Sequence, residues 1–315
     1  MGKKSVGIIM LLTLLLLVAC DGDAEEDESL EDQEVLEQEQ SPEEEASQDE
    51  ASDLPEDEEA IEEEEEGEGE EGEKEPDEKT AALSLEEIQE RYQDQEPKEW
   101  GESVTGVNSR IDTEDRVIAL TFDACGGAYD QALIQYLKEQ EIPATLFISG
   151  EWIDNHPDTL VALGENPNFD IANHGKHHKP LSVQGKSAYG IPGTESIEGV
   201  YEEVYGNHLK IKGLTGHRSQ FFRSGTAYYD EVAVKIVEDL GEIAVNYNVL
   251  GDAGATFTAN QIYESMIQAK SGSIMLFHMN HPDSDIAEGV KLGVEALRED
   301  GFEFVLLKDY RDQLQ

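Results

Sequence analysis

The sequence predicts an α/β fold in which helices surround a parallel sheet that is closed, or nearly closed, as a barrel. Within residues 101–315, seven apolar runs of β-strand character alternate with amphipathic helical patterns, which is typical of parallel sheets. Polar residues stand where several of these runs end, and strand ends are where such folds carry their chemistry. An open doubly wound sheet is the alternative arrangement.

The first twenty residues have the pattern of a lipoprotein signal. Lys3 and Lys4 precede an apolar run over 6–18, which as a helix would rise only about 20 Å and so would not span a hydrocarbon core of about 30 Å. The run ends in Leu-Val-Ala-Cys, which resembles the bacterial lipobox, whose cysteine (here Cys20) is acylated. We therefore expect residues 1–20 to be a signal and the mature chain to be extracytoplasmic and lipid-anchored to the cell membrane. An ordinary cleaved signal with an incidental cysteine is the alternative.

Residues 21–80 are predicted to be a disordered acidic tether. From Asp21 to Arg91 there is no Phe, Tyr or Trp, and Glu and Asp dominate the stretch. So few apolar groups cannot offset the entropy lost on ordering the backbone, and the like charges repel one another. A flexible chain of this length has an r.m.s. reach of about 40–50 Å, so the stretch can separate an anchor from a folded domain. A recognition tail is the alternative.

The charge balance excludes one class of partner. Residues 101–315 hold 33 acidic and 16 basic side chains, so this part carries −17 of the formal net charge of −50. Phosphate backbones are bound by clustered Lys and Arg, and we therefore expect no nucleic-acid partner. The chain has two cysteines, Cys20 and Cys125; since Cys20 is assigned to lipidation, no intramolecular disulfide is expected.

Residues 81–104 are predicted to form a lead-in helix and linker, and residues 105–315 the main domain. Ser84-Leu85-Glu86-Glu87 has the pattern of a capping box that opens a short helix. The seven candidate strands are apolar runs bounded by turn residues, at 117–122, 144–149, 169–172, 219–223, 243–250, 273–278 and 302–307. Between them, helical stripes run from Ile197 to Val204 and from Val232 to Leu240, and Pro157 suits a helix first turn.

Chemically versatile side chains stand at or just after the ends of four of these runs. Asp123, His174, Arg223 and His278 each end or follow a separate apolar run, and His178 follows His174 by four residues. Two imidazoles at that spacing share one face of a helical turn, where both can bind one metal ion. A polar loop with solvated histidines is the alternative for the pair. The carboxylate and the third imidazole at other strand ends favour a metal site.

Five blocks within residues 105–310 resemble, in the same order, those of the polysaccharide deacetylase family, which includes chitin and peptidoglycan N-deacetylases. The blocks are TFDACGG at 121–127, NHGKHHKPL at 173–181, FFRSGTAYY at 221–229, NYNVLGDA at 246–253 and GSIMLFH at 272–278. The resemblance implies a distorted (β/α)7 barrel, a divalent metal ion, and hydrolysis of N-acetyl groups from hexosamine units. The implied substrate is a glycan such as peptidoglycan or a chitooligosaccharide.

The resemblance also implies a metal site and a general base. His174 and His178 would hold the ion, which we expect to be zinc, with cobalt or nickel as alternatives. The ion would polarise the acetamide carbonyl and lower the pKa of a water molecule. Asp123 would take the proton of that water, and Arg223 would keep the Asp123 carboxylate ionised and oriented.

A general acid and substrate contacts follow from the same resemblance. His278 would protonate the leaving amine, and Asp252 would raise its pKa and fix its tautomer. Leu276 would pack on the acetyl methyl group, and Tyr228 would stack on a sugar ring. A backbone N–H near Gly225 or Thr226 would complete an oxyanion site.

One departure from the family pattern concerns the metal. The family's second aspartate, its usual third ligand, is Ala124 here, and a methyl group binds no ion. Asp123, Cys125 and His281 are candidates to replace it; a weakly held metal or a metal-free site are the other possibilities. A further departure is Ser224-Gly225 in place of the family's Pro-Pro.

The sequence therefore leaves three functions open. The first is a membrane-tethered, metal-dependent N-deacetylase of glycans. The second is a non-catalytic glycan-binding lipoprotein that kept the barrel and lost turnover with its metal aspartate. The third is a hydrolase of another C–N bond on the same scaffold, because fold resemblance alone does not fix function.

Overall fold

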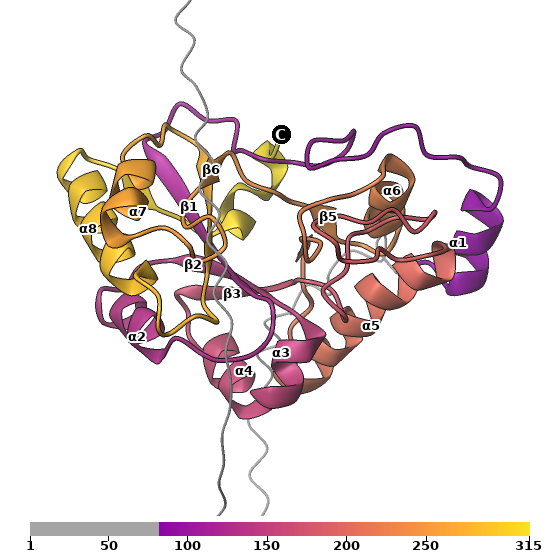
Figure 1. Cartoon of the computed structure of the whole chain (residues 1–315), viewed down its shortest axis with the longest axis horizontal. Helices are drawn as coiled ribbons and strands as arrows, with labels where there is room; N and C mark the ends of the chain where they lie inside the picture. Colours follow the sequence, from indigo (N-terminus) through magenta and orange to yellow (C-terminus); the bar gives the residue numbers. More distant parts are fainter. Residues whose placement is uncertain (1–81) are drawn as a thin grey trace, which may run out of the picture. The chain divides into compact units, whose positions relative to one another are not determined.

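Eight parallel strands form one curled sheet (Figure 1). The computed structural model describes residues 82–315, so the predicted signal, Cys20 and the predicted tether lie outside the described residues. The strands are β1 (Val117–Ala124), β2 (Ala144–Ile148), β3 (Phe169–Asn173), β4 (Phe221–Phe222), β5 (Ile243–Ala244), β6 (Val249–Leu250), β7 (Ser273–His278) and β8 (Glu303–Phe304). Their order is β5-β4-β3-β2-β1-β7-β6, with β8 paired to the start of β1.

Helices occupy most of the connections and lie around the outside of the sheet (Figure 1). They are α1 (Leu85–Tyr92), α2 (Gln131–Glu139), α3 (Gly150–Asn155), α4 (Pro157–Gly164), α5 (Ile197–Thr215), α6 (Glu231–Asp239), α7 (Ala259–Met266), α8 (Ile286–Glu299) and the 3-10 helix η1 (Leu307–Gln313). The predicted capping box at Ser84 and the predicted first-turn Pro157 are both confirmed. Within residues 82–315 no helix is both long enough and apolar enough to cross a membrane.

The predicted distorted (β/α)7 barrel is confirmed, but its closure differs from the prediction. The expected strand over 243–250 is wrong as a single strand, because β5 pairs with β4 whereas β6 pairs with β7. Residues 245–248 carry the chain from one edge of the sheet to the other. The Val245 N–H donates to the Phe222 carbonyl at 2.9 Å, and the Asn248 N–H donates to the Ile274 carbonyl at 3.1 Å. The last predicted strand, 302–307, is likewise shortened to β8.

Strand β1 separates two apolar layers and so sets the direction of the residues at its end. All eight residues of β1 are buried, as expected for a strand covered on both faces. The even-numbered Ile118, Leu120, Phe122 and Ala124 pack in a cluster with residues of α2 and α8. The odd-numbered Ala119 packs in the barrel interior with Phe147 of β2 and Ile274 of β7. Because side chains alternate along a strand, Asp123 faces the barrel interior.

The predicted lead-in segment packs onto the barrel's helices. In α1, Ile88 is fully buried and Tyr92 is 4% exposed, in a cluster with Val200 of α5 and Val232 of α6. The Tyr92 hydroxyl also donates to Asp239 Oδ2 at 2.7 Å. Helix α1 is therefore part of the same packed unit as the barrel.

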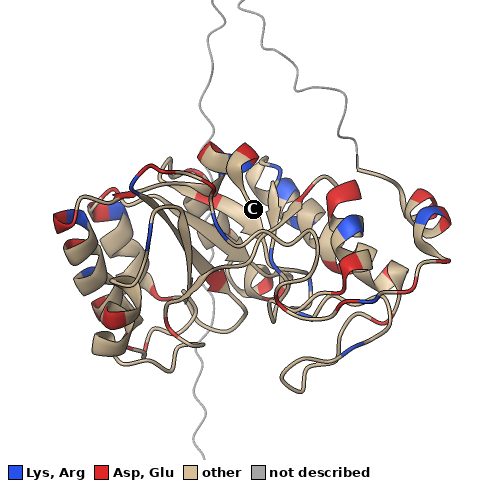
Figure 2. Cartoon of the chain, turned by 90° about the horizontal axis from the view of Figure 1, so that it is seen from above, with Lys and Arg blue, Asp and Glu red and all other residues tan. Residues whose placement is uncertain are grey.

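Charged side chains of the described part lie mostly on its outer helices and loops, where Lys and Arg are interspersed among more numerous Asp and Glu (Figure 2). Surface ion pairs join Arg116 to Asp300 at 2.7 Å and Lys210 to Asp154 at 2.5 Å. Exposed pairs of this kind contribute about 0–1 kcal/mol each, so they add little to stability.

Candidate active site

His174 and His178 lie just after β3, and their ring centroids are 4.9 Å apart. The predicted helical turn is wrong, because residues 174–178 form a loop rather than a helix. Gly175 at φ 81° and His178 at φ 52° both adopt the left-handed backbone region. The tight loop brings the two rings together by folding back, not by helical spacing.

Two neighbours hold this loop. Glu203 of α5 is 1% exposed and accepts hydrogen bonds from the backbone N–H groups of His177 and Lys179, each at 3.0 Å. Burial raises the pKa of the Glu203 carboxyl above its ordinary value, although the two N–H groups oppose this. On the other side, a Cβ at Gly225 would stand 2.3 Å from the carbonyl carbon of His178, so only glycine allows this close approach.

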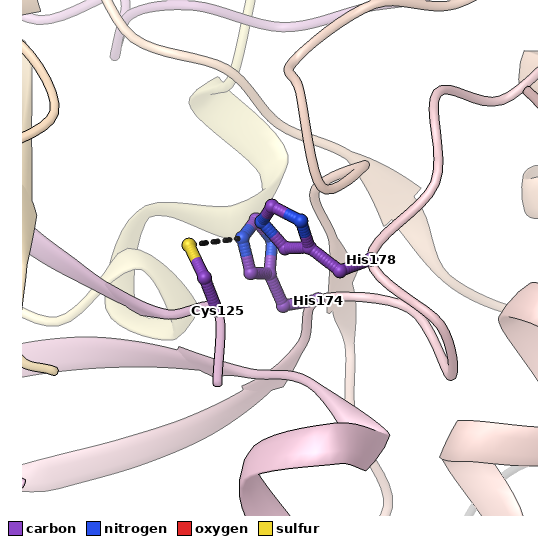
Figure 3. A group of neighbouring side chains, drawn as sticks. All are labelled: Cys125, His174 and His178. Atoms are coloured by element: carbon purple, nitrogen blue, oxygen red, sulfur yellow. Dashed lines mark hydrogen bonds between the residues drawn. The ribbon is translucent and has the colours of Figure 1, made fainter. Parts of the chain in front are cut away.

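His174, His178 and Cys125 present their ligand atoms to one another within 4.8 Å (Figure 3). His174 Nδ1 lies 2.9 Å from the Arg223 carbonyl oxygen, which can only accept, so Nδ1 carries the proton. In the neutral ring, Nε2 therefore directs its lone pair toward Cys125 Sγ, 3.6 Å away. His178 Nε2 is buried and has no hydrogen-bond partner within residues 82–315. A set of electron-pair donors with an unsatisfied buried nitrogen fits a divalent metal ion.

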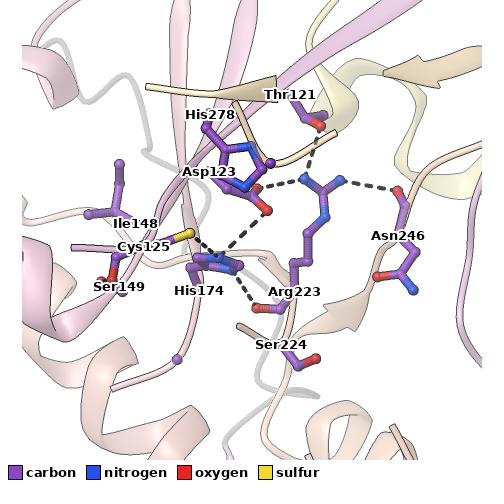
Figure 4. Close-up of polar contacts among 12 residues, drawn as sticks. Thr121, Asp123, Cys125, Ile148, Ser149, His174, Arg223, Ser224, Asn246 and His278 are labelled. Atoms are coloured by element: carbon purple, nitrogen blue, oxygen red, sulfur yellow. Dashed lines mark hydrogen bonds and ion pairs between the residues drawn. The ribbon is translucent and has the colours of Figure 1, made fainter. Parts of the chain in front are cut away.

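Asp123 and Arg223 form a buried ion pair beside this group (Figure 4). Arg223 Nη1 donates to Asp123 Oδ1 at 2.7 Å and to Thr121 Oγ1 at 3.0 Å. Its Nε and Nη2 donate to the carbonyls of Val245 and Asn246, each at 3.1 Å. The guanidinium is fully buried, so these contacts fix it in one position.

The surroundings of Asp123 favour its ionised form. Burial raises the pKa of the carboxyl, but Arg223, His174 and His278 together outweigh burial, so the pKa lies below its ordinary value. Asp123 Oδ2 lies 3.6 Å from His174 Nε2 and is the carboxylate oxygen that Arg223 leaves free. Asp123 is therefore suited to accept a proton at neutral pH.

His278 ends β7 and is held by Asp252. Both Asp252 carboxylate oxygens lie 3.0 Å from His278 Nδ1, and Oδ2 also accepts the His278 backbone N–H at 2.7 Å. Burial lowers the pKa of the imidazole, but the hydrogen bonds with Asp252 and the nearby Cys125 outweigh burial and raise the pKa well above its ordinary value. The ring is therefore suited to hold a proton at neutral pH.

A cavity of about 430 Å³ opens beside these residues. Asp123, His278 and Leu276 line it, together with Gly225 and Thr226. Tyr189, Ile191 and Tyr247 also line the cavity, and none of the three is among the predicted site residues. No local pattern marked them, since Tyr189 and Ile191 stand in an irregular loop and Tyr247 in the bend between β5 and β6.

Two residues of the predicted set, Tyr228 and His281, lie outside the cavity lining and the donor group. Tyr228 packs against Trp100 and Tyr189, with ring centroids 5.7 and 5.4 Å apart. His281 is exposed, and its ring centroid is 6.0 Å from that of His278. The structure brings the other predicted residues together around one pocket: Asp123, His174, His178, Arg223, Asp252, Leu276 and His278.

Known proteins that are similar in sequence belong to the family that the sequence blocks resemble. A sequence model of the polysaccharide deacetylase family matches residues 110–245. A peptidoglycan-N-acetylglucosamine deacetylase of Bacillus cereus is 25% identical over 207 residues, which cover 62% of this chain and 71% of that protein. A bifunctional xylanase/deacetylase of Pseudobutyrivibrio xylanivorans is 22% identical over 209 residues; these cover 66% of this chain but only 32% of that longer protein.

A solved structure shows the same fold. It is that of a CE4 family pseudoenzyme from Bacillus anthracis, similar with a TM-score of 0.57 at 18% identity, covering 70% of this chain and 71% of that one. The segment matched by the family includes Asp123, both histidines of the pair and Arg223, whereas Asp252 and His278 lie beyond it. The fold, the matched segment and the curated relatives agree that this chain carries a polysaccharide deacetylase domain.

Proposed function

We propose that the protein is a metal-dependent hydrolase that removes N-acetyl groups from hexosamine units of a glycan, peptidoglycan or a chitooligosaccharide. One observation carries the proposal: a carboxylate whose surroundings favour its ionised form, Asp123, and an imidazole suited to hold a proton, His278, line the same cavity beside the His174–His178 pair. The relative from Bacillus cereus is named for deacetylation of N-acetylglucosamine in peptidoglycan, which supports this substrate class.

The first half of the reaction uses the base. A divalent metal ion held by His174 and His178 would polarise the acetamide carbonyl and make a water molecule more acidic. Asp123 takes a proton from the water that attacks the acetyl carbon. Arg223 binds the other carboxylate oxygen, so the base keeps its orientation while its charge changes.

The second half uses the acid. Because Asp252 binds His278 Nδ1, the Nε2 proton is the one that His278 gives to the amine as the C–N bond breaks. The products are acetate and a free amino sugar unit. Leu276 lines the cavity beside the acid and would contact the acetyl methyl group, and the backbone around Gly225 and Thr226 would receive the carbonyl oxygen.

Acetate release tests the proposal. Protein loaded with zinc, cobalt or nickel is incubated with peptidoglycan and with chitooligosaccharides, and acetate is measured. Asp123→Asn and His278→Ala should each lower kcat by about 10²–10⁴-fold, since each removes one proton-transfer group. His281→Ala is the matched control, because this exposed histidine lies outside the site. Failure of the metal-loaded protein to release acetate from any N-acetylated glycan would contradict the proposal.

A non-catalytic glycan-binding protein is the second candidate. Ala124 lacks the carboxylate that the family uses as a ligand, and a pseudoenzyme shares the fold. If binding is the function, calorimetry should give the same glycan affinity for wild type, Asp123→Asn and His278→Ala, with no turnover in any of them.

We further propose that Cys20 anchors the protein on the outer side of the cell membrane. The lipobox-like Leu-Val-Ala-Cys sequence supports this. Cys20→Ser should move the protein from the membrane fraction to the soluble fraction and abolish labelling by a fatty-acid probe. Cys125→Ser is the cysteine-matched control and should leave both unchanged.

A further inference from the structure

We infer that the Cys125 thiolate is the third protein ligand of the metal ion, so that the site is a zinc site of one sulfur and two imidazole nitrogens. This inference rests on the metal site of the proposed function, but it does not depend on the reaction. Three kinds of observation support it: the direction of the β1 side chains, the spacing of the ligand atoms, and the hydrogen-bonding state of the two imidazoles.

Because side chains alternate in direction along β1, the side chain of residue 125 points to the face of the strand on which the site lies. Thr121 and Asp123 face the barrel interior, where Arg223 binds both side chains. Cys125 continues this odd-numbered series and reaches His174. Ala124 is fully buried in the outer apolar cluster with Phe122, on the other face of the strand. The chain therefore offers the thiol to the imidazole pair from the position directly after the missing carboxylate.

The spacing of the ligand atoms fits a bound ion. Tetrahedral zinc with bonds of about 2.3 Å to sulfur and 2.0–2.1 Å to nitrogen holds these two atoms about 3.6 Å apart. Cys125 Sγ and His174 Nε2 are 3.6 Å apart. All three ligand atoms lie within 4.8 Å of one another, so small side-chain rotations can place them around one ion.

The hydrogen-bonding state of the two imidazoles points to the same place. His174 Nε2 directs a lone pair at the sulfur, because Nδ1 is committed to the Arg223 carbonyl. Orientation of a ligating imidazole by a backbone carbonyl is typical of metal sites. The buried Nε2 of His178 has no partner in the described part of the chain, although buried polar atoms are normally hydrogen-bonded. An ion among the three atoms would satisfy both imidazoles and the thiolate.

The other two candidates for the missing ligand fit less well. Asp123 is bound by Arg223 at 2.7 Å and is needed as the base. His281 is exposed and stands outside the group of ligand atoms. A thiolate keeps the ligand charge that a carboxylate would supply, and its softness favours zinc over magnesium or manganese. Because Cys125 rather than Asp123 is then the third ligand, Asp123 stays free for proton transfer.

Cobalt spectroscopy tests the inference without any measurement of turnover. The full-length Cys20→Ser protein, in which Cys125 is the only thiol, is titrated with Co²⁺. A thiolate bound to cobalt gives an intense near-ultraviolet charge-transfer absorption that imidazole and carboxylate ligands do not give. We expect this absorption in the parent protein and its complete loss in Cys125→Ser and Cys125→Asp. Cobalt binding without this absorption, or no binding of cobalt or zinc, would overturn the inference.

Alkylation gives a second readout. Zinc should protect Cys125 from iodoacetamide, as followed by mass spectrometry, and a chelator should restore labelling. His178→Ala should abolish the protection, whereas His281→Ala should retain it. Equal labelling with and without zinc would refute ligation. Charge transfer and protection without acetate release would support this ligand set and count against the proposed reaction alone.

Discussion

Arg223 is the residue on which the contacts of the site converge. Its guanidinium is fully buried and binds the carboxylate of Asp123, the hydroxyl of Thr121 and the carbonyls of Val245 and Asn246. Arg223→Met should therefore lower the free energy of unfolding by about 3–5 kcal/mol, because the Asp123 charge stays buried without a partner. Urea unfolding measures this loss.

The double variant provides the control. Asp123→Asn combined with Arg223→Met removes both charges, and its loss of stability should be smaller than the sum of the two single losses. Additive losses would mean that the two side chains do not stabilise each other.

In the proposed reaction Asp252 is a positioning residue, since it acts through His278. Asp252→Asn keeps an oxygen that can accept the His278 backbone N–H but removes the charge that favours the imidazolium. We expect kcat for acetate release to fall by about 10²-fold with little change in KM, because the acid is weakened and the sugar contacts remain. A wild-type kcat in a correctly folded variant would contradict this role.

The identity of the site residues could be predicted because long apolar runs end in unusual polar groups. Asp123, His174 and His278 stand at the ends of strands that are almost wholly buried, so their polarity interrupts the pattern. Asp252 is predicted by the resemblance alone, and only the fold shows its contact with His278. Tyr189, Ile191 and Tyr247 could not be predicted, because loop conformation rather than local pattern brings them to the cavity.

At the scale of elements, the loop after β3 depends on a close backbone contact. Gly225→Ala would place a methyl group against the His178 backbone, at 2.3 Å from its carbonyl carbon, and so push this imidazole away from His174. We expect zinc affinity to fall by about 10–100-fold, as when groups that orient a ligand are lost. Competition with a chromogenic chelator measures the affinity.

Gly213→Ala is the matched control. Gly213 lies in α5, and a Cβ there would meet no atom within 4 Å apart from the adjoining backbone of its own helix. This variant should bind zinc as the wild type does and be equally or more stable, since alanine favours a helix by up to about 1 kcal/mol. Equal zinc affinity in both glycine variants would refute the role of the close contact.

Elements defined by local pattern were predictable, whereas those set by distant contacts were not. The capped α1, α4 with Pro157 at its start and the long strands of the sheet follow from their own sequences. The break within 243–250 does not, because Asn246 is held by the carbonyls of Glu102 and Ala227, far away in the chain. The loop at 174–178 likewise depends on Glu203, which lies one helix further along.

For the whole molecule, Asp170 links stability to pH. The Asp170 side chain, on β3, is 17% exposed, and its Oδ1 atom lies 3.7 Å from Lys308 Nζ. Asp309 and His217 also act on its carboxyl group. Burial raises the pKa of the carboxyl despite Lys308. Because the folded-state pKa lies above that of the unfolded chain, about 3.9, the stability that Asp170 contributes is present below this value. It is lost as the pH rises through the folded-state pKa.

Asp170→Asn should therefore gain stability relative to wild type as the pH rises from about 3.5 to 7, with the difference disappearing at the acidic end. Urea unfolding at a series of pH values measures the difference. Lys308→Met should enlarge the loss of stability that rising pH causes, since it removes the positive charge that favours ionised Asp170. A difference that is independent of pH, or of opposite slope, would contradict this account.

The barrel as a whole also depends on Arg223, the side chain that binds the proposed base Asp123. Arg223 joins Asp123 to the bend at Val245 and Asn246, across which the sheet nearly closes. Selection for a stable barrel alone would thus preserve this arginine in descendants that had lost turnover. Among relatives, its presence is evidence of intact architecture, whereas under the proposed mechanism changes at Asp123 or His278 are the first signs that turnover has been lost.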